Sequence, residues 1–129
     1  MTITLLYAGF LAFLLVALGF NVVRLRIRHK VDLGDGGVPG IIQAIRAHGN
    51  FTENVPLAVV LIALLEGVGQ PAWLVHTLGA ALVLFRLCHA QGLLSSPGTS
   101  IGRFVGTAGT NTLLIVSGAI AIVSAVGRL

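Results

Sequence analysis

Polar residues recur at helical spacing in the segment around residues 46–53. Arg46, Asn50 and Glu53 stand at positions i, i+4 and i+7, which places them on one face of a helix. Arg86 and His89 are three residues apart and share a helix face in the same way. If the two faces meet, Glu53 neutralises one arginine and a surplus of positive charge remains. A cationic, partly desolvated cleft of this kind binds anions.

The elements that must position these residues are strongly apolar. Of 129 residues, 56% are hydrophobic and only 9% are charged, against about 25% charged in a typical soluble protein. This composition excludes an intrinsically disordered chain and argues against a soluble globular domain. The formal net charge of +4 lies between long apolar runs, which favours membrane orientation over nucleic-acid binding. The single cysteine, Cys88, excludes an intrachain disulfide.

The apolar runs predict an all-α membrane protein with four transmembrane helices in one domain, 1–129. A spanning helix needs about 20 mostly apolar residues, and the segments of that length are 3–24, 41–66, 71–94 and 102–126. The first segment is interpreted as an uncleaved helix, because Met1–Thr4 lacks the positive charge that begins a signal peptide. The sequence therefore predicts a four-helix bundle in a membrane.

The distribution of basic residues predicts the orientation of these spans. Four spans place both termini on one side of the membrane. Of the eight Lys and Arg residues, only Arg128 lies on the side of the termini, and the others lie on the opposite side. Because cytoplasmic segments carry the excess of Lys and Arg, we expect both termini to face away from the cytoplasm.

All four predicted helices bring polar groups to the cytoplasmic end. Charged side chains at membrane depth must face protein or water, since each costs about 2.5–3.5 kcal/mol in lipid. The polar faces are therefore expected in a bundle interior or a subunit interface. Other interpretations stay open: Arg26, Arg28 and Lys30 contact lipid headgroups, Arg46 and Glu53 form a structural ion pair, or Arg86 reaches the interface along its aliphatic stem.

Polar residues toward the other end have simpler interpretations. Glu66 is expected to be solvated at the outer end of the second helix, and His76 to be structural. The third and fourth helices are expected to lack polar residues at the membrane midplane and above. Gly102 and Gly106 form a G-x-x-x-G pattern, which predicts close packing of the fourth helix against a neighbour.

With these residues in view, the chain resembles the MAPEG family, the membrane-associated proteins of eicosanoid and glutathione metabolism. The strongest similarity is in Arg46–Pro56, R-A-H-G-N-F-T-E-N-V-P, which is similar to the family's R-A-H-x-N-x-x-E segment. Supporting similarities are Val23–Arg26, Arg86–His89 and Arg103. The resemblance implies a bacterial member in the inner membrane and a homotrimer of four-helix subunits.

The resemblance also implies that glutathione, as co-substrate, binds between subunits near the cytoplasmic face. Residues carried over as glutathione contacts are Arg24, Arg46, Asn50, Glu53, Arg86 and His89. His48, in the same inner half of the second helix, is added to this predicted binding set. Arg103 corresponds to the position that stabilises the glutathione thiolate, and Asp35 aligns with an acidic residue near the thiol. No metal is implied.

The chemistry of glutathione suits these residues. Arginines bind carboxylates bidentately, and Glu53 is suited to the ammonium group. A nearby guanidinium lowers the pKa of a thiol and so raises its thiolate fraction. The thiolate then attacks an electrophile that arrives from the bilayer.

Departures from the family pattern limit the function. Leu93 stands where several members have tyrosine, Phe104 where the prostaglandin synthase has serine, and Gly49 where some members have a basic residue. These changes argue against prostaglandin synthase activity. The sequence predicts a glutathione-dependent transferase or peroxidase for lipophilic electrophiles. The alternatives are a non-catalytic trimer that binds glutathione, lipid or another anion, and a small transporter or channel subunit. Membrane lipid is an expected partner and nucleic acid is not.

Overall fold

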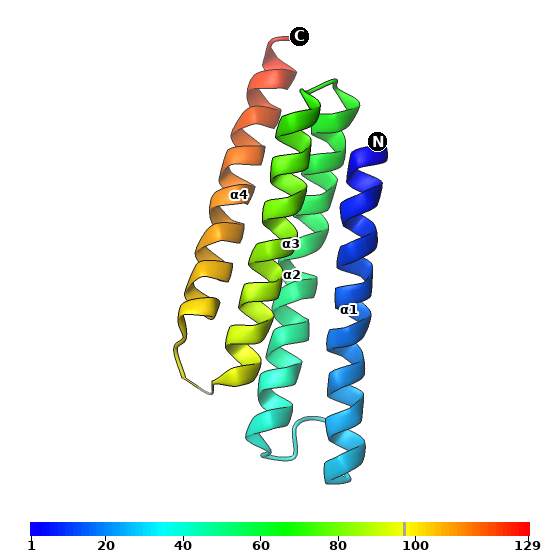
Figure 1. The fold of residues 1–129 in the computed structure, drawn as a ribbon, viewed down its shortest axis with the longest axis vertical. Coiled ribbons are helices and arrows are strands. Elements are labelled where there is room, and N and C mark those ends of the chain that lie inside the picture. The colour runs from blue at the N-terminus through cyan, green and yellow to red at the C-terminus, as the bar shows by residue number, and fades with distance from the viewer. Residues whose placement is uncertain (97) are drawn as a thin grey trace.

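The computed structural model describes residues 1–96 and 98–129. Every regular element in these residues is a helix, and four helices are long and apolar enough to cross a membrane. They are α1 (Thr2–His29), α2 (Pro39–Gly67), α3 (Ala72–Ser95) and α4 (Ile101–Val126) (Figure 1). The predicted all-α fold with four membrane-length helices is confirmed.

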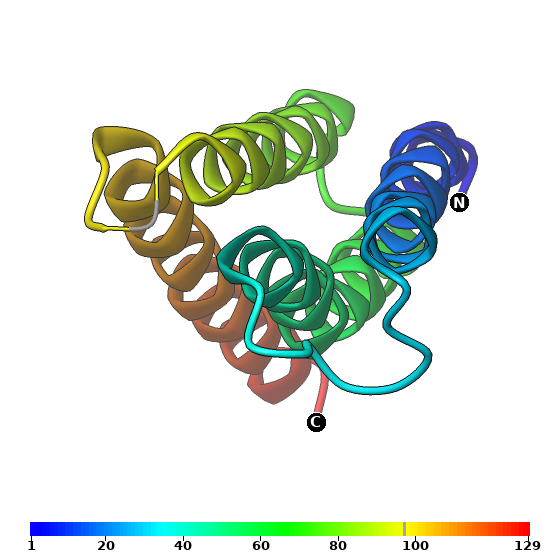
Figure 2. The same ribbon diagram turned by 90° about the horizontal axis from the view of Figure 1, so that it is seen from below.

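Successive helices run in opposite directions, so both termini lie at one end of the bundle (Figure 1). We call this the termini end. The opposite end, which carries the α1–α2 and α3–α4 connections, is the loop end. Viewed along the bundle, α4 packs on α3 and α2, and α1 packs on α2 and α3 (Figure 2). In the described residues α1 makes no contact with α4.

The helix α2 lies between the others because one of its faces is continuously apolar. It begins at Pro39, which suits the first turn because that position needs no intrahelical N–H bond. Its buried residues recur every three or four positions, and they are Ile41, Ala44, Ala47, Phe51, Val55, Ala58, Ile62 and Leu65. The opposite face, from Arg46 through Glu53 to Leu64, is exposed.

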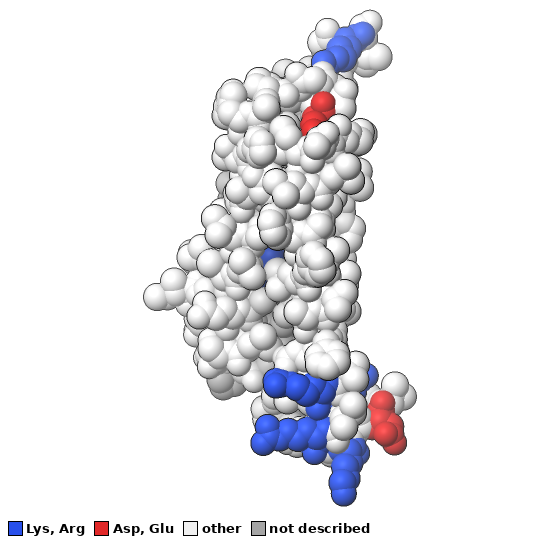
Figure 3. All heavy atoms as spheres, turned by 45° about the vertical axis from the view of Figure 1, so that its right-hand side comes forward, with Lys and Arg blue, Asp and Glu red and all other residues white. Residues whose placement is uncertain are grey.

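The helix α1 is longer at its C-terminal end than the predicted span, which stops at residue 24. The helix continues to His29 with Arg26 and Arg28 in its last turn, where cations interact favourably with the helix dipole. Its 28 residues span roughly 42 Å at 1.5 Å per residue, more than the hydrocarbon core of about 30 Å. Charged side chains accordingly gather at the two ends, with a mostly uncharged surface between them (Figure 3).

The contact between α3 and α4 is the most extensive in the bundle, and glycines make it close. A methyl group added at Gly102 would lie 2.7 Å from the carbonyl oxygen of Cys88, and one at Gly106 would lie 2.6 Å from that of Phe85. Both neighbours are backbone atoms, which cannot move aside cheaply. The close packing predicted from the G-x-x-x-G pattern is therefore present, and it holds the start of α4 against the last turns of α3.

Candidate functional site

A polar cavity of about 350 Å³ lies between α2, α3 and α4 toward the loop end. We call it the polar cavity; it is lined by Ile42, Gln43, Arg46, Asn50, His89, Leu93, Ser96, Arg103 and Thr107. The structure thus brings together four residues singled out in the sequence, namely Arg46, Asn50, His89 and Arg103. They come from three helices, which explains why no local pattern in the sequence contains all of them.

Arg86 lies directly behind this cavity and is 2% exposed. Its Nη1 donates to Asn50 Oδ1 at 2.8 Å, and its Nη2 donates to the carbonyl oxygen of Gly106 at 2.7 Å. The Nε atom has no partner, and no carboxylate lies within ion-pair distance of Arg86 in the described residues. Arg86 therefore orients Asn50 at the cavity wall and adds a positive charge that no carboxylate of the described residues neutralises.

Arg103 is positioned by the start of α4. Ser100 caps the helix, since its Oγ accepts from the backbone N–H of Arg103 at 3.3 Å and donates to the carbonyl oxygen of Gly92 at 2.9 Å. The same serine therefore ties α4 to the end of α3. The Arg103 side chain donates from Nη1 to the carbonyl oxygen of Gly98 at 2.6 Å. Sequence reasoning missed Ser100, although a serine just before a helix is a recognised capping signal.

Arg46 and Glu53 form the ion pair that the sequence left open, but it is loose. Arg46 Nη1 and Glu53 Oε1 are 3.8 Å apart, and the two side chains are 59% and 57% exposed. Glu53 lies thirteen residues before Glu66 in α2, roughly 20 Å along the helix axis. With Glu66 taken as the outer edge of a hydrocarbon core about 30 Å thick, this exposed charge lies at membrane depth. A charge there must be covered by protein or reached by water.

Five of the nine predicted site residues do not line the polar cavity. Arg86 lies behind it and Glu53 lies one turn beyond Asn50; the other three are farther away. Arg24 is exposed on α1 and donates to Asn21 Oδ1 of its own helix at 2.9 Å. His48 packs against α1, where a methyl group at Gly19 would lie 3.5 Å from its ring. Asp35 accepts from the backbone N–H of Gly37 at 2.8 Å and so shapes the α1–α2 loop. Within one chain, these residues are separate from the cluster around Arg103.

Other polar residues were missed by the sequence analysis. Gln43, Ser96 and Thr107 line the cavity, and Asn111 lies exposed near the middle of α4. The expectation that the third and fourth helices lack polar residues at midplane is therefore wrong. The available signal was spacing, because Thr107 and Asn111 follow Arg103 at i+4 and i+8.

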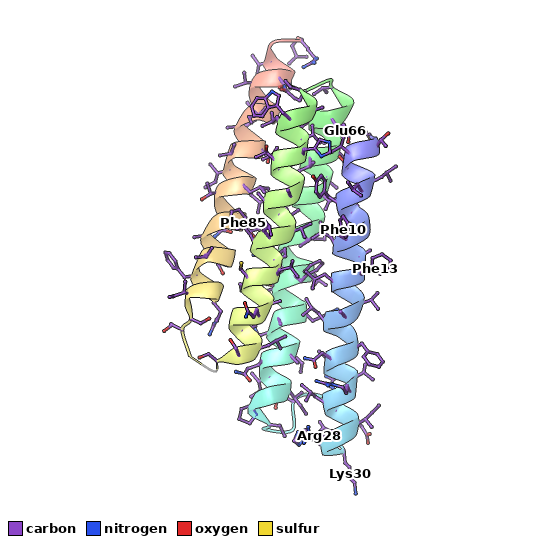
Figure 4. All side chains as sticks on the ribbon, viewed as in Figure 1. Phe10, Phe13, Arg28, Lys30, Glu66 and Phe85 are labelled. Atoms are coloured by element: carbon purple, nitrogen blue, oxygen red, sulfur yellow. The ribbon has the colours of Figure 1, made fainter. Side chains whose placement is uncertain are left out.

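The expectation that Glu66 is solvated is also wrong. Its side chain is 12% exposed and accepts from Ile3 N at 2.9 Å, Thr4 N at 2.8 Å and Thr4 Oγ1 at 2.6 Å. The reason is that the first N–H groups of a helix have no intrahelical partners, and Glu66 supplies them from α2, beside the start of α1 (Figure 4). His76 Nδ1 lies 2.9 Å from the hydroxyl of Tyr7, a contact between α3 and α1.

Comparison with known proteins identifies the family of this four-helix chain. The model of the MAPEG family matches residues 4–123, nearly the whole chain. The chain belongs to the MAPEG family. It is similar to inner membrane protein YecN of Escherichia coli K12, with 43% identity over 90 residues that cover 70% of this chain and 69% of that protein. YecN of E. coli O6:H1, strain CFT073, matches with the same identity and coverage. The resemblance inferred from Arg46–Pro56 is confirmed, and the four helices of this MAPEG chain are those of a membrane protein.

Proposed function

We propose that this MAPEG chain is a glutathione-dependent transferase or peroxidase that acts on lipophilic electrophiles. The observation that carries the proposal is the polar cavity, where Arg46, Asn50, His89 and Arg103 meet in front of the buried Arg86. Its volume of about 350 Å³ falls within the range of about 300–1,000 Å³ for small-molecule sites. The unneutralised positive charge suits a peptide with two carboxylates and a thiol.

Each polar group of glutathione has a complementary group near the cavity. The guanidinium groups of Arg46 and Arg103 suit the two carboxylates or the thiolate, because arginine binds anions through paired N–H donors. Glu53 lies one turn beyond Asn50 and suits the ammonium group. Arg103 stands in the first turn of α4, where the helix dipole also favours negative charge. Together they favour the thiolate, which attacks an electrophile from the bilayer.

The proposal includes a homotrimer. Its support is the exposed face of α2. Glu53 lies there at membrane depth, and Arg46, roughly 30 Å from Glu66 along the axis, lies at the edge of the hydrocarbon core; both side chains are more than half exposed in the described residues. A second copy packed on that face removes the cost of exposing these charges to lipid. It also offers a reason why Arg24 and Asp35 lie away from the polar cavity of their own chain: in the trimer, they approach the cavity of a neighbour.

We further propose that the protein lies in the inner membrane with both termini outside the cytoplasm. The E. coli relative is named as an inner membrane protein, and the basic residues concentrate at the loop end. The polar cavity then opens toward the cytoplasm. Reporter fusions after Leu129 test the orientation: a reporter that is active only in the cytoplasm would invert it and separate the cavity from cytoplasmic glutathione.

The proposed activity is tested with detergent-purified protein. Glutathione binding is measured by calorimetry, and turnover is measured with 1-chloro-2,4-dinitrobenzene and with cumene hydroperoxide. We expect binding and turnover of at least one acceptor, both weakened in Arg46→Ala. Arg28→Ala is the matched control, because Arg28 lies at the loop end outside the cavity (Figure 4). Equal losses in the two variants, or no binding at millimolar glutathione, would contradict the proposal.

One observation favours the second candidate, a non-catalytic glutathione-binding trimer. Leu93 lines the cavity and has no hydroxyl group to donate to a thiolate. One N–H donor of Arg103 is already bonded to the Gly98 carbonyl oxygen, which leaves fewer donors for the thiolate. Glutathione binding without turnover of either acceptor would select this candidate over the transferase.

A further inference from the structure

A line of polar residues on α4 continues from the polar cavity toward the middle of the membrane. Arg103, Thr107 and Asn111 stand at i, i+4 and i+8 and so follow one ridge of the helix. Arg103 and Thr107 line the cavity. Asn111 lies one turn beyond Thr107, roughly 6 Å along the axis at 1.5 Å per residue. The polar surface of the cavity thus extends along the outer face of α4.

The side chains at the far end of this line are not used by the chain itself. Thr110 Oγ1 donates to the carbonyl oxygen of Gly106, and Thr77 Oγ1 donates to that of Trp73. For Thr107 and Asn111, no side-chain hydrogen bond is found in residues 1–96 and 98–129, and both residues are exposed. A carboxamide without a partner in an apolar medium is costly, so Asn111 is suited to a partner from outside the chain.

The surroundings of Asn111 are apolar. Phe104 and Ile115 stand seven residues before it and four residues after it, on the same face of α4, and are 75% and 72% exposed. A molecule that lies along this face meets hydrocarbon side chains on both sides and one carboxamide between them. This combination suits a lipophilic molecule with a single hydrogen-bonding oxygen.

We propose that Asn111 selects the acceptor: it binds the carbonyl oxygen of a lipophilic α,β-unsaturated carbonyl compound whose β-carbon reacts with the glutathione thiolate. The inference rests on the proposed function and names the substrate class of the same site. The carbonyl oxygen of such a compound lies only three bonds from the β-carbon. A compound held at Asn111 therefore brings its β-carbon part of the way toward Thr107, roughly 6 Å away along the axis, and the approaching sulfur atom covers the rest. The thiolate then lies near Arg103 and Thr107, and the carbonyl oxygen near Asn111.

The reaction is an addition without an oxidant or reductant. The glutathione thiol first gives its proton to water. The sulfur forms a bond to the β-carbon, the π electrons of the C=C bond shift, and negative charge develops on the carbonyl oxygen. Asn111 Nδ2–H donates to that oxygen and stabilises the charge as an oxyanion-hole donor does. The α-carbon finally takes a proton from water, which gives the saturated thioether.

The test compares two acceptors of similar length, trans-2-nonenal and 1-iodooctane, because only the first has a carbonyl oxygen. In Asn111→Leu we expect kcat/KM for nonenal to fall by about tenfold or more, while the value for iodooctane stays within roughly twofold. Asn111→Gln keeps the donor and restores part of the nonenal activity. Thr112→Val, a neighbouring exposed position on α4, is the matched control and changes neither value.

Two measurements keep the inference falsifiable. Thermal unfolding and the oligomeric state of each variant are measured in the same detergent, and Asn111→Gln serves if the leucine variant does not fold. An equal fall for both acceptors, or dissociation of the oligomer in Asn111→Leu, would show that Asn111 serves a second copy of the chain and would overturn the inference. If the wild type turns over iodooctane and the preference is unchanged in the variant, only the inference fails. If the wild type turns over neither nonenal nor iodooctane but does turn over 1-chloro-2,4-dinitrobenzene or cumene hydroperoxide, again only the inference fails. If it turns over none of the four, the proposed function fails as well.

Discussion

The two ends of the bundle use their polar groups in opposite ways. At the termini end, Glu66 accepts from Ile3 and Thr4, and Gln70 donates to Ser124 Oγ at 2.7 Å. Arg128 there donates to backbone carbonyl oxygens, one of them that of Ser124. At the loop end, Arg86 has no carboxylate partner within the described residues, and several polar side chains face one cavity.

The difference separates structural polar groups from groups that are available to a ligand. Groups that satisfy one another join helices within the chain, as Glu66 joins α2 to α1. Groups that converge on a cavity with surplus charge stabilise the chain less than their number suggests, because desolvation opposes their burial. Seven of the eight Lys and Arg residues lie toward the loop end, but the number of charges is not the whole difference. What separates the two ends is also whether the polar groups have partners within the chain.

The largest effect is expected from widening the α3–α4 contact. In Gly106→Ala, the new methyl group meets the Phe85 carbonyl oxygen at 2.6 Å, and overpacking of this kind costs about 1–3 kcal/mol. Chemical unfolding in detergent measures the loss of stability. Glutathione binding measures whether the cavity between α2, α3 and α4 keeps its shape. The matched control is Gly118→Ala on the same helix, where nothing lies within 4 Å of the added group. Equal stability of the two variants would contradict this account of the α3–α4 contact.

Arg103→Leu is expected to separate binding from chemistry. Most glutathione affinity should remain, while turnover falls by about tenfold or more, which corresponds to about 1.4 kcal/mol in the barrier. The pH at which thiolate absorbance appears should move upward, because the positive charge beside the thiol is lost. Arg128→Leu, at the termini end, is the control and should keep its turnover. If turnover persists and the thiolate titration is unshifted in Arg103→Leu, activation lies elsewhere, first at Asp35 or His89.

The two glutamates of α2 offer the most direct test of the comparison. Glu66→Gln should lower the thermal unfolding temperature and leave glutathione affinity unchanged, since a neutral amide is a weaker acceptor for the N–H groups of α1. Glu53→Gln should leave the thermal unfolding temperature unchanged and lower glutathione affinity. The expected reduction is about two- to fivefold, as for an exposed charge pair. Thermal scans and calorimetry on both variants measure this. A loss of glutathione affinity in Glu66→Gln would contradict the assignment of a purely structural role to the polar groups of the termini end.

The smallest expected effect is on salt dependence. Raising the ionic strength from about 0.1 M to about 1 M shortens the screening length from about 10 Å to about 3 Å, so glutathione affinity should fall. The affinity should fall less steeply with salt in Arg46→Ala than in the wild type, because that variant has lost a charge that lines the cavity. In Arg28→Ala the salt dependence should equal that of the wild type. Calorimetric titrations at several salt concentrations measure the slopes. A salt-independent affinity in the wild type would argue against carboxylate recognition by arginine.

The fold was predictable because its signals are local. Four long apolar runs require four helices. The helix α1 continues past its predicted end at residue 24 because a further basic turn, which is not part of the apolar run, is also helical. The convergence of Arg46, Asn50, His89 and Arg103 was predictable from helical periodicity and a common depth. Neither argument requires knowledge of which helices touch.

The remainder depends on how the helices pack. The cap formed by Glu66 joins residues more than sixty positions apart, and no local pattern announces such a partner. Arg24 was assigned to the site by the family resemblance and His48 by its depth in the second helix, but the side of α2 on which α1 packs decides which faces they occupy. Ser100 is a single polar residue, and its bond to Gly92 appears only once α3 and α4 are placed side by side.

The sequence order of the helix contacts has a consequence for biosynthesis. The α1–α2 and α3–α4 contacts each join helices that are adjacent in the chain, so α1 and α2 are able to pair while the later helices are still being synthesised. The bond from Thr4 to Glu66 forms only when α2 has been threaded across the bilayer to its far end. A nascent chain arrested before residue 66 therefore presents α1 without its cap. We expect such a chain to be retained beside the insertion machinery longer than one arrested after all of α2 has left the ribosome.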